Sequence, residues 1–184
     1  MASAETDEVI EAVRKAVDRI SEFMNPKLIP EVGMNIGYAV SGATSVMDVA
    51  AVEGRIVRKG NSVFPVGDVK MGASDHVARI ILTAMKYDPE MRAAANIRYS
   101  EVILKILDEM PLEVRSFDRA GEPAGVSTMD WGVASCCSED DVPDVISDPG
   151  AIGKEPMIRI LGEDPASVVN NILMLSERIN DKIL

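Results

Sequence analysis

The order of the predicted strands and helices is the feature of this sequence that most constrains its fold. An amphipathic helix over residues 5–24 is followed by two hairpin-like stretches that end before Gly72. Beyond Gly72, strand and helix patterns are interspersed but do not alternate strictly. A parallel doubly wound sheet needs regular alternation, so this order favours a mixed sheet with helices on its faces.

Individual elements follow from periodicity and from turn residues. The patterns predict strands over 36–40, 63–66, 112–117, 143–147 and 157–161, and one or two strands over 49–57 around Gly54. They predict helices that begin near residues 74, 88, 100, 127 and 165. The helix that begins near residue 88 is expected to be a short connecting helix that ends at residue 95. We expect a single domain overall, with an N-terminal helix over 1–25 and the main domain over 26–184.

The charge of the chain restricts its partners. The formal net charge is −11, whereas nucleic acids and anionic membranes are bound by basic surfaces. No apolar run approaches the roughly 20 residues that span a bilayer. We therefore expect no direct nucleic-acid binding and no membrane insertion.

Cysteine usage and the N-terminus indicate a cytoplasmic protein. Cys136 and Cys137 are adjacent and have no second pair, and adjacent cysteines rarely form a structural disulfide. Reduced thiols are typical of the cytoplasm. The first residues are polar and acidic, unlike a signal peptide.

The only histidine, His76, lies where a helix is predicted to begin. The preceding Gly72, Ala73 and Ser74 are small, and exposed amides at a helix start attract anions. The positive helix end favours a neutral imidazole, which can donate one hydrogen bond. The alternative is that His76 is simply a solvated residue at a helix start.

Three further segments carry basic residues. Arg55 and Arg58 lie three residues apart in an apolar strand, where one can face a site, or both are surface charges. Asp118 and Arg119 follow a predicted strand, where open α/β sheets place ligands, or they form a surface pair. Lys154 lies in a loop between Gly153 and a strand that carries Arg159, and can reach a phosphate, or the loop is a polar connection with ordinary charges.

Several common motifs are absent. The sequence has no P-loop, no dinucleotide fingerprint, no HExxH or CxxC zinc pattern and no nucleophile elbow. The residues alone therefore indicate a small-molecule site with anion-binding loops.

Six stretches in order are similar to one family, the archaeal-type thiamine-phosphate synthase domain, which often forms the C-terminal part of a bifunctional hydroxymethylpyrimidine kinase. They are IPEVGMNI (29–36), DVAAVEGRIVR (48–58), GASDHVAR (72–79), FDR (117–119), STMDWG (127–132) and IGKEPMIR (152–159). The resemblance implies a three-layer α/β/α fold with a mixed, largely antiparallel sheet, like that of class II aldolases.

The resemblance also implies an activity. It is the coupling of hydroxymethylpyrimidine diphosphate to hydroxyethylthiazole phosphate with release of diphosphate, a transferase reaction assisted by Mg²⁺. The family's catalytic arginine and histidine fall on Arg55 and His76. The resemblance further implies small phosphorylated substrates and a link to a pyrimidine kinase, and we expect a homodimer as the commonest assembly.

The remaining site residues are expectations from motif position. The residues expected to bind substrate are Asn35, Gly72, Ala73, Ser74, Asp118, Arg119, Ser127, Met129, Lys154 and Glu155, with Asp118 and Glu155 also expected to hold Mg²⁺.

The alternative function is that of a non-catalytic sensor. Similar domains follow helix-turn-helix units and bind thiamine phosphates to control transcription. About 25 residues precede the matching region here, too few for a helix-turn-helix with its two helices. The chain could still be an excised sensor domain. A sensor has no need of Arg55 and His76, although it could retain them, so these residues discriminate between the two functions.

Overall fold

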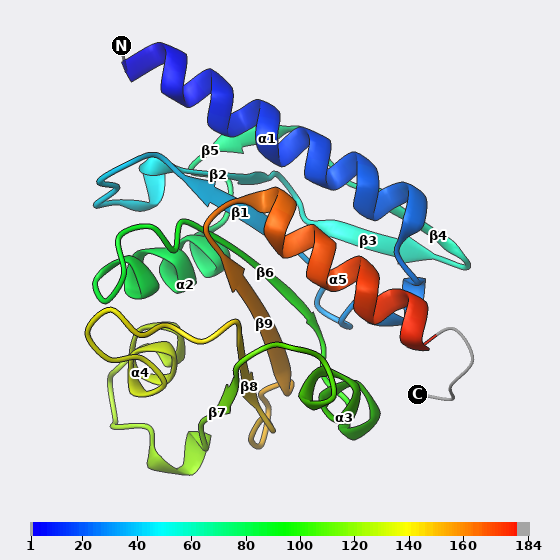
Figure 1. Cartoon of the computed structure of the whole chain (residues 1–184), viewed down its shortest axis with the longest axis vertical. Coiled ribbons are helices and arrows are strands. Elements are labelled where there is room, and N and C mark those ends of the chain that lie inside the picture. Colours follow the sequence, from blue (N-terminus) through cyan, green and yellow to red (C-terminus); the bar gives the residue numbers. More distant parts are fainter. Residues whose placement is uncertain (1, 180–184) are drawn as a thin grey trace.

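A seven-stranded mixed sheet forms the centre of the protein (Figure 1). The structure, a computed structural model, describes residues 2–179, so the last five residues of the expected main domain lie outside it. The strand order is β5-β2-β1-β6-β9-β8-β7. Every neighbouring pair of this sheet is antiparallel except β7 and β8, which are parallel.

The bounds of the strands agree with most of the predicted positions. They are β1 Ile36–Ala39, β2 Val49–Val52, β5 Val69–Met71, β6 Ala93–Arg98, β7 Val114–Ser116, β8 Val145–Asp148 and β9 Met157–Gly162. A separate hairpin joins β3 Ile56–Lys59 and β4 Ser62–Pro65. The pattern did not predict β5.

Helices cover both faces of the sheet. On one face α1 Ala2–Phe23, α3 Glu101–Asp108 and α5 Pro165–Ile179 share one apolar cluster with the sheet. On the other face α2 Asp75–Met85 and α4 Thr128–Ser135 share a second cluster. Figure 1 shows α1 and α5 on one side of the strands and α2 and α4 on the other side. The predicted three-layer α/β/α fold with a largely antiparallel sheet is confirmed.

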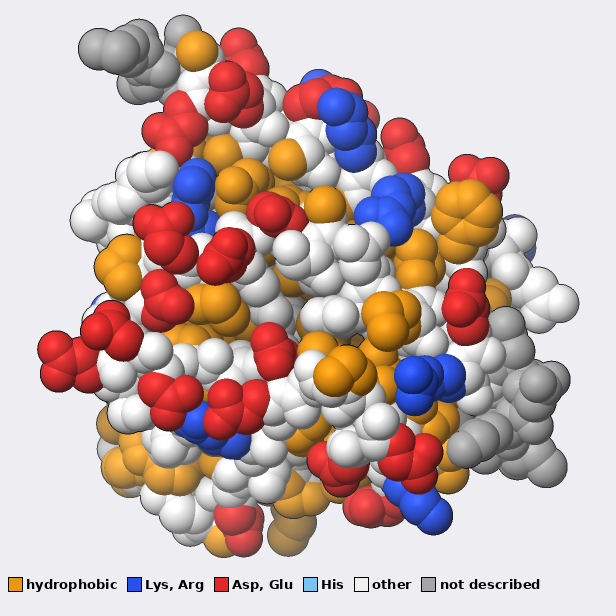
Figure 2. Space-filling view, viewed as in Figure 1, with side chains coloured by type: hydrophobic (Ala, Val, Ile, Leu, Met, Phe, Trp, Pro, Cys, Tyr) orange, Lys and Arg blue, Asp and Glu red, His pale blue; other side chains and the backbone are white. Residues whose placement is uncertain are grey.

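Helical periodicity explains how α1 joins the core. Val9, Val13, Val17 and Ile20 are spaced three or four residues apart and are all buried. Acidic side chains predominate over basic ones on the surface that α1 and α5 cover, in agreement with the net charge of −11 (Figure 2). No helix in residues 2–179 is long and apolar enough to cross a membrane.

The short helix predicted between residues 88 and 95 is wrong. Asp88 begins a turn in which its carbonyl accepts a hydrogen bond from the Met91 amide at 3.1 Å. The chain then enters β6, which lies between β1 and β9 near the middle of the sheet. A buried strand paired on both edges needs no alternation of polar and apolar residues, so its three successive alanines lacked a strand pattern.

Antiparallel pairing brings four strand ends to one end of the sheet. These are the start of β1, the end of β2, the end of β6 and the start of β9. The turn that follows β2 and the loop that precedes β1 therefore lie close together, beside the first residues of α2.

Candidate active site

A cavity of about 230 Å³ opens at this end of the sheet. It draws its walls from the loop before β1, the turn after β2, the start of α2, and the strands β6 and β9. The lining residues are Val32, Gly33, Asn35, Arg55, Ser74, His76, Asn96, Glu155 and Met157. Five of the expected site residues, from segments far apart in the sequence, thus meet in one place.

Arg55 lies in a strained turn rather than within a strand. Its φ is 73° and that of the preceding Gly54 is 74°, so two successive residues adopt the left-handed conformation. The guanidinium donates through Nη1 to the carbonyl oxygen of Val32. The expectation that Arg55 and Arg58 share one strand is therefore wrong, since β3 begins at Ile56 and contains only Arg58. Strain of this kind at a non-glycine residue is concentrated at functional sites.

His76 lies in the first turn of α2, as expected. Ser74 caps this helix by accepting a hydrogen bond from the Val77 amide at 3.3 Å. Nε2 of His76 is closed off from solvent and has no hydrogen-bond partner among residues 2–179. His76 lines the cavity and is half-buried, so it is not the fully solvated residue of the alternative interpretation.

The surroundings of His76 keep its imidazole neutral. The pKa of His76 is lowered from 6.5 to about 4, first by burial and then by the positive charges of Arg159, Arg55 and Arg119, against an opposing effect of Asp75. This direction agrees with the neutral ring expected from the sequence, and its causes are burial and three arginines.

Two asparagines hold the cavity wall together. The backbone N–H of Asn35 donates to Oδ1 of Asn96 at 2.7 Å, and Nδ2 of Asn96 donates to the backbone carbonyl of Gly33 at 3.2 Å. The Asn35 side chain bonds both backbone groups of Val52, at 2.8 and 3.0 Å. Asn96 was missed by the sequence analysis, although an asparagine within an alanine-rich buried strand is a signal for such a role.

A buried charge cluster lies behind His76. Arg159 and Asp148 are both 0% exposed, with Nη1 and Oδ2 2.9 Å apart. Arg119 pairs with the same carboxylate, from Nε to Oδ1 at 2.5 Å, and is only 9% exposed. Two guanidinium groups therefore share one carboxylate, which leaves a surplus of positive charge beside the cavity. Arg119 was among the site residues expected from the sequence, whereas Asp148 was not.

The remaining expected residues do not line this cavity. Lys154 pairs with Glu122 at 3.2 Å, and the buried Met129 packs against α2 in the apolar cluster. A Cβ on Gly72 would meet Sδ of Met47 at 2.5 Å, so this glycine is needed for packing. Ala73, Asp118, Arg119 and Ser127 also lie outside the lining.

The two carboxylates expected to hold Mg²⁺ both accept backbone hydrogen bonds, and only Glu155 lines the cavity. Asp118 accepts a hydrogen bond from the Ala120 amide at 2.8 Å. Glu155 accepts from the amides of Glu31 and Val32 at 2.9 and 3.3 Å. No cluster of three or more His, Cys, Asp or Glu side chains in residues 2–179 has the arrangement of a metal site. The residues present therefore do not fit a metal ion held by the protein alone.

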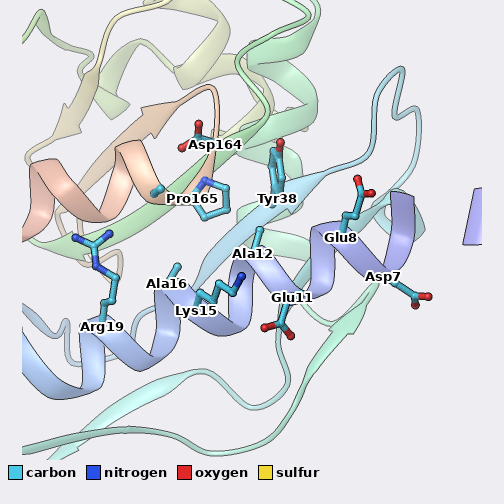
Figure 3. A pocket seen from close by; sticks show the side chains of 11 residues that line it. Asp7, Glu8, Glu11, Ala12, Lys15, Ala16, Arg19, Tyr38, Asp164 and Pro165 are labelled. Carbon is cyan, nitrogen blue, oxygen red and sulfur yellow. The ribbon is translucent and has the colours of Figure 1, made fainter. Parts of the chain in front are cut away.

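A larger cavity of about 740 Å³ lies between α1 and the start of α5 (Figure 3). Ala12, Ala16, Tyr38 and Pro165 face it, with charged side chains at its rim. It contains none of the expected site residues, so its size does not make it the candidate active site.

The match to known proteins decides the family. A family model described as thiamine-phosphate synthase ThiN matches residues 12–174. The chain belongs to the ThiN family. The fold is also found in solved structures of low identity, such as a sugar-phosphate aldolase from Thermotoga maritima, with 10% identity and a TM-score of 0.54. This likeness agrees with the expected class II aldolase-like fold of a ThiN domain.

Individual ThiN relatives are similar over most of the chain. A bifunctional thiamine biosynthesis protein ThiDN from Methanocaldococcus jannaschii is 46% identical over 85% of this chain, which spans 38% of that protein. A thiamine-phosphate synthase ThiN from Methanothermobacter thermautotrophicus is 40% identical over 86% of this chain and 87% of its own length. A crystal structure of the C-terminal domain of a phosphomethylpyrimidine kinase has 41% identity and a TM-score of 0.84, over 91% of this chain and 98% of that one.

Proposed function

We propose that this chain is a thiamine-phosphate synthase that couples hydroxymethylpyrimidine diphosphate to hydroxyethylthiazole phosphate. The observation that carries the proposal is that Arg55 and His76 line one cavity in a member of the ThiN family. Three arginines lie close enough to His76 to lower its pKa, so this end of the sheet is suited to an anionic ligand despite the acidic chain.

The main requirement of this reaction is stabilisation of the leaving diphosphate. The bond between the pyrimidine methylene carbon and oxygen breaks, and its electron pair leaves with the diphosphate. The thiazole nitrogen forms the new carbon–nitrogen bond with a lone pair that it already holds, so no base removes a proton. Arg55 supplies a permanent positive charge and two parallel N–H donors for the departing oxygens.

The low pKa of His76 narrows its role. With a pKa of about 4, very few molecules carry an imidazolium at neutral pH. His76 therefore acts as a neutral hydrogen-bond donor to the leaving diphosphate and not as a proton donor. Its loss should lower the rate more than it weakens substrate binding.

Magnesium stays a prediction from the family resemblance. Mg²⁺ binds through substrate phosphates and waters with only one or two carboxylates, and Glu155 is the one carboxylate that lines the cavity. The roles proposed for Arg55 and His76 do not depend on a protein-held metal. The expected homodimer and the cooperation with a pyrimidine kinase also stay predictions.

Purified chain incubated with both substrates and Mg²⁺ tests the proposal. The expected result is thiamine phosphate and diphosphate in equal amounts. Equilibrium binding of thiamine phosphate is measured in parallel by calorimetry. Tight binding without turnover would reject the synthase in favour of the sensor.

A further inference from the structure

A second cavity adjoins the candidate active site. Its volume is about 510 Å³. It is lined by Ile29, Pro30, Glu31, Gly33, Val57, Arg58 and Arg98. Gly33 lines both cavities, so the loop before β1 forms the boundary between them.

Two arginines without partners give this second cavity a positive character. Arg98 lies at the end of β6 and is half-buried, and Arg58 is exposed on β3. Neither guanidinium forms a hydrogen bond or an ion pair with another residue in the part of the chain that the structure describes, although both arginines pair in their strands through the backbone. Glu31 is the only acid among the lining residues. A local excess of arginine in a chain of net charge −11 marks a site for an anion.

The size of the first cavity argues that a second one is needed. Clefts that enclose a single small ligand measure about 300–1,000 Å³, and the cavity at Arg55 has about 230 Å³. The proposed reaction brings together two heterocycles, each with its own phosphate group. The two anions must lie on opposite sides of the bond that forms, because like charges repel and the diphosphate leaves away from the attacking nitrogen.

Gly33 suits the boundary between the two cavities. Its φ is +86°, and a Cβ added there would come within 3.2 Å of Cδ of Arg55. The backbone therefore passes directly beside the catalytic arginine, with no side chain to separate the two spaces.

We propose that Arg58 and Arg98 form the subsite for the phosphate of the second substrate, the thiazole monophosphate, while Arg55 and His76 face the diphosphate of the first. The assignment of the ligand rests on the proposed function. The charge and the position of the two arginines are independent of it.

Calorimetric titration of the full chain with hydroxyethylthiazole phosphate tests the subsite without requiring turnover. Arg58→Gln and Arg98→Gln should each weaken binding by roughly tenfold, the effect of losing one charge-assisted hydrogen bond. Arg98→Lys should restore part of the affinity. Arg14→Gln, on the exposed side of α1, removes the same charge from a residue that does not line the cavity and should change the affinity less than about twofold.

Steady-state kinetics then separates the two phosphate sites. The KM for the thiazole phosphate should rise in both Gln variants, with the KM for the pyrimidine diphosphate within about twofold of its original value. The advantage of the phosphorylated thiazole over its free alcohol, measured as a ratio of kcat/KM, should shrink in both variants. Unchanged thiazole phosphate affinity, or a rise confined to the KM of the diphosphate, would overturn the subsite. Retained binding without any turnover in the unmodified chain would instead reject the synthase and leave the subsite standing.

Discussion

The guanidinium of Arg159 and the carboxylate of Asp148 form an ion pair that is shut off from solvent, with both side chains 0% exposed and 2.9 Å between Nη1 and Oδ2. Arg119 binds the other oxygen of Asp148. One buried carboxylate thus holds two cations whose charges reach His76. This cluster determines how both the stability and the chemistry of the site respond to mutation and pH.

Removal of the Asp148 carboxylate, which two arginines share, should lower the stability of the protein. Asp148→Asn leaves Arg159 as an uncompensated buried charge, so we expect the free energy of unfolding in urea to fall by about 3–5 kcal/mol. Glu53→Gln is the matched control, because Glu53 pairs with Lys70 where both side chains are more than half exposed. That change should cost less than about 1 kcal/mol. Equal losses in the two variants would show that the buried ion pair contributes no more to stability than the exposed one.

The single histidine allows a direct measurement of its pKa. His76 gives the only imidazole signal in an NMR titration of this chain, and that signal should titrate near pH 4. Arg55→Gln removes one of the positive charges that lower the pKa, so the pKa should rise. Arg58→Gln, three residues along the chain, should leave it unchanged. An unmodified protein that titrates near 6.5 would contradict the buried, neutral ring.

Stability should depend on pH through the same residue. The pKa of His76 is about 4 in the folded state and 6.5 without the protein environment, so the unfolded chain takes up a proton first as the pH falls. The contribution of the neutral His76 ring to the free energy of unfolding is fully present above pH 6.5 and is lost progressively between pH 6.5 and about 4. Its full size is on the order of 3 kcal/mol. Chemical denaturation at several pH values should show this decrease, and His76→Gln should remove it between pH 6.5 and 5, above the range in which carboxylates titrate.

A side chain at Gly33 should affect Arg55. Gly33→Ala places a Cβ 3.2 Å from Cδ and 3.3 Å from Cβ of Arg55, which pushes the arginine out of position. Gly60→Ala is a matched control, because Gly60 also has a positive φ, of 60°, but a Cβ there meets nothing within 4 Å. Both variants should lose about 1–2 kcal/mol from backbone strain. Only Gly33→Ala should lose turnover by tenfold or more, and equal turnover in the two would argue against the contact.

The sequence was most informative where local patterns decide structure. The apolar periodicity of α1 and the cap at Ser74 predicted two helices, because such signals act within a few residues. The strand β6 was missed, because its alanine run is stabilised by pairing with β1 and β9 rather than by its own pattern. The site residues Asn96 and Asp148 were missed for a related reason. Their roles depend on partners 61 and 29 residues away along the chain, namely Asn35 and Arg119.

The turn at Arg55 is a further feature that could not be predicted from the sequence. Motif position placed this arginine at the site, but its left-handed φ of 73° is not evident from residue type. The conformation results from the hairpin that follows, in which the Val66 amide donates to the Arg55 carbonyl at 2.9 Å. Pairing within the β3–β4 hairpin therefore sets the backbone conformation of Arg55.

The central claim is that Arg55 and His76 stabilise the leaving diphosphate, and kcat at saturating concentrations of both substrates tests it most directly. Arg55→Gln should lower the kcat for thiamine phosphate formation by about 10²–10³-fold, and His76→Gln by about 10²-fold. The KM for the pyrimidine diphosphate should change far less in the His76 variant. A kcat within twofold of the original in both variants, with folding intact, would contradict the account.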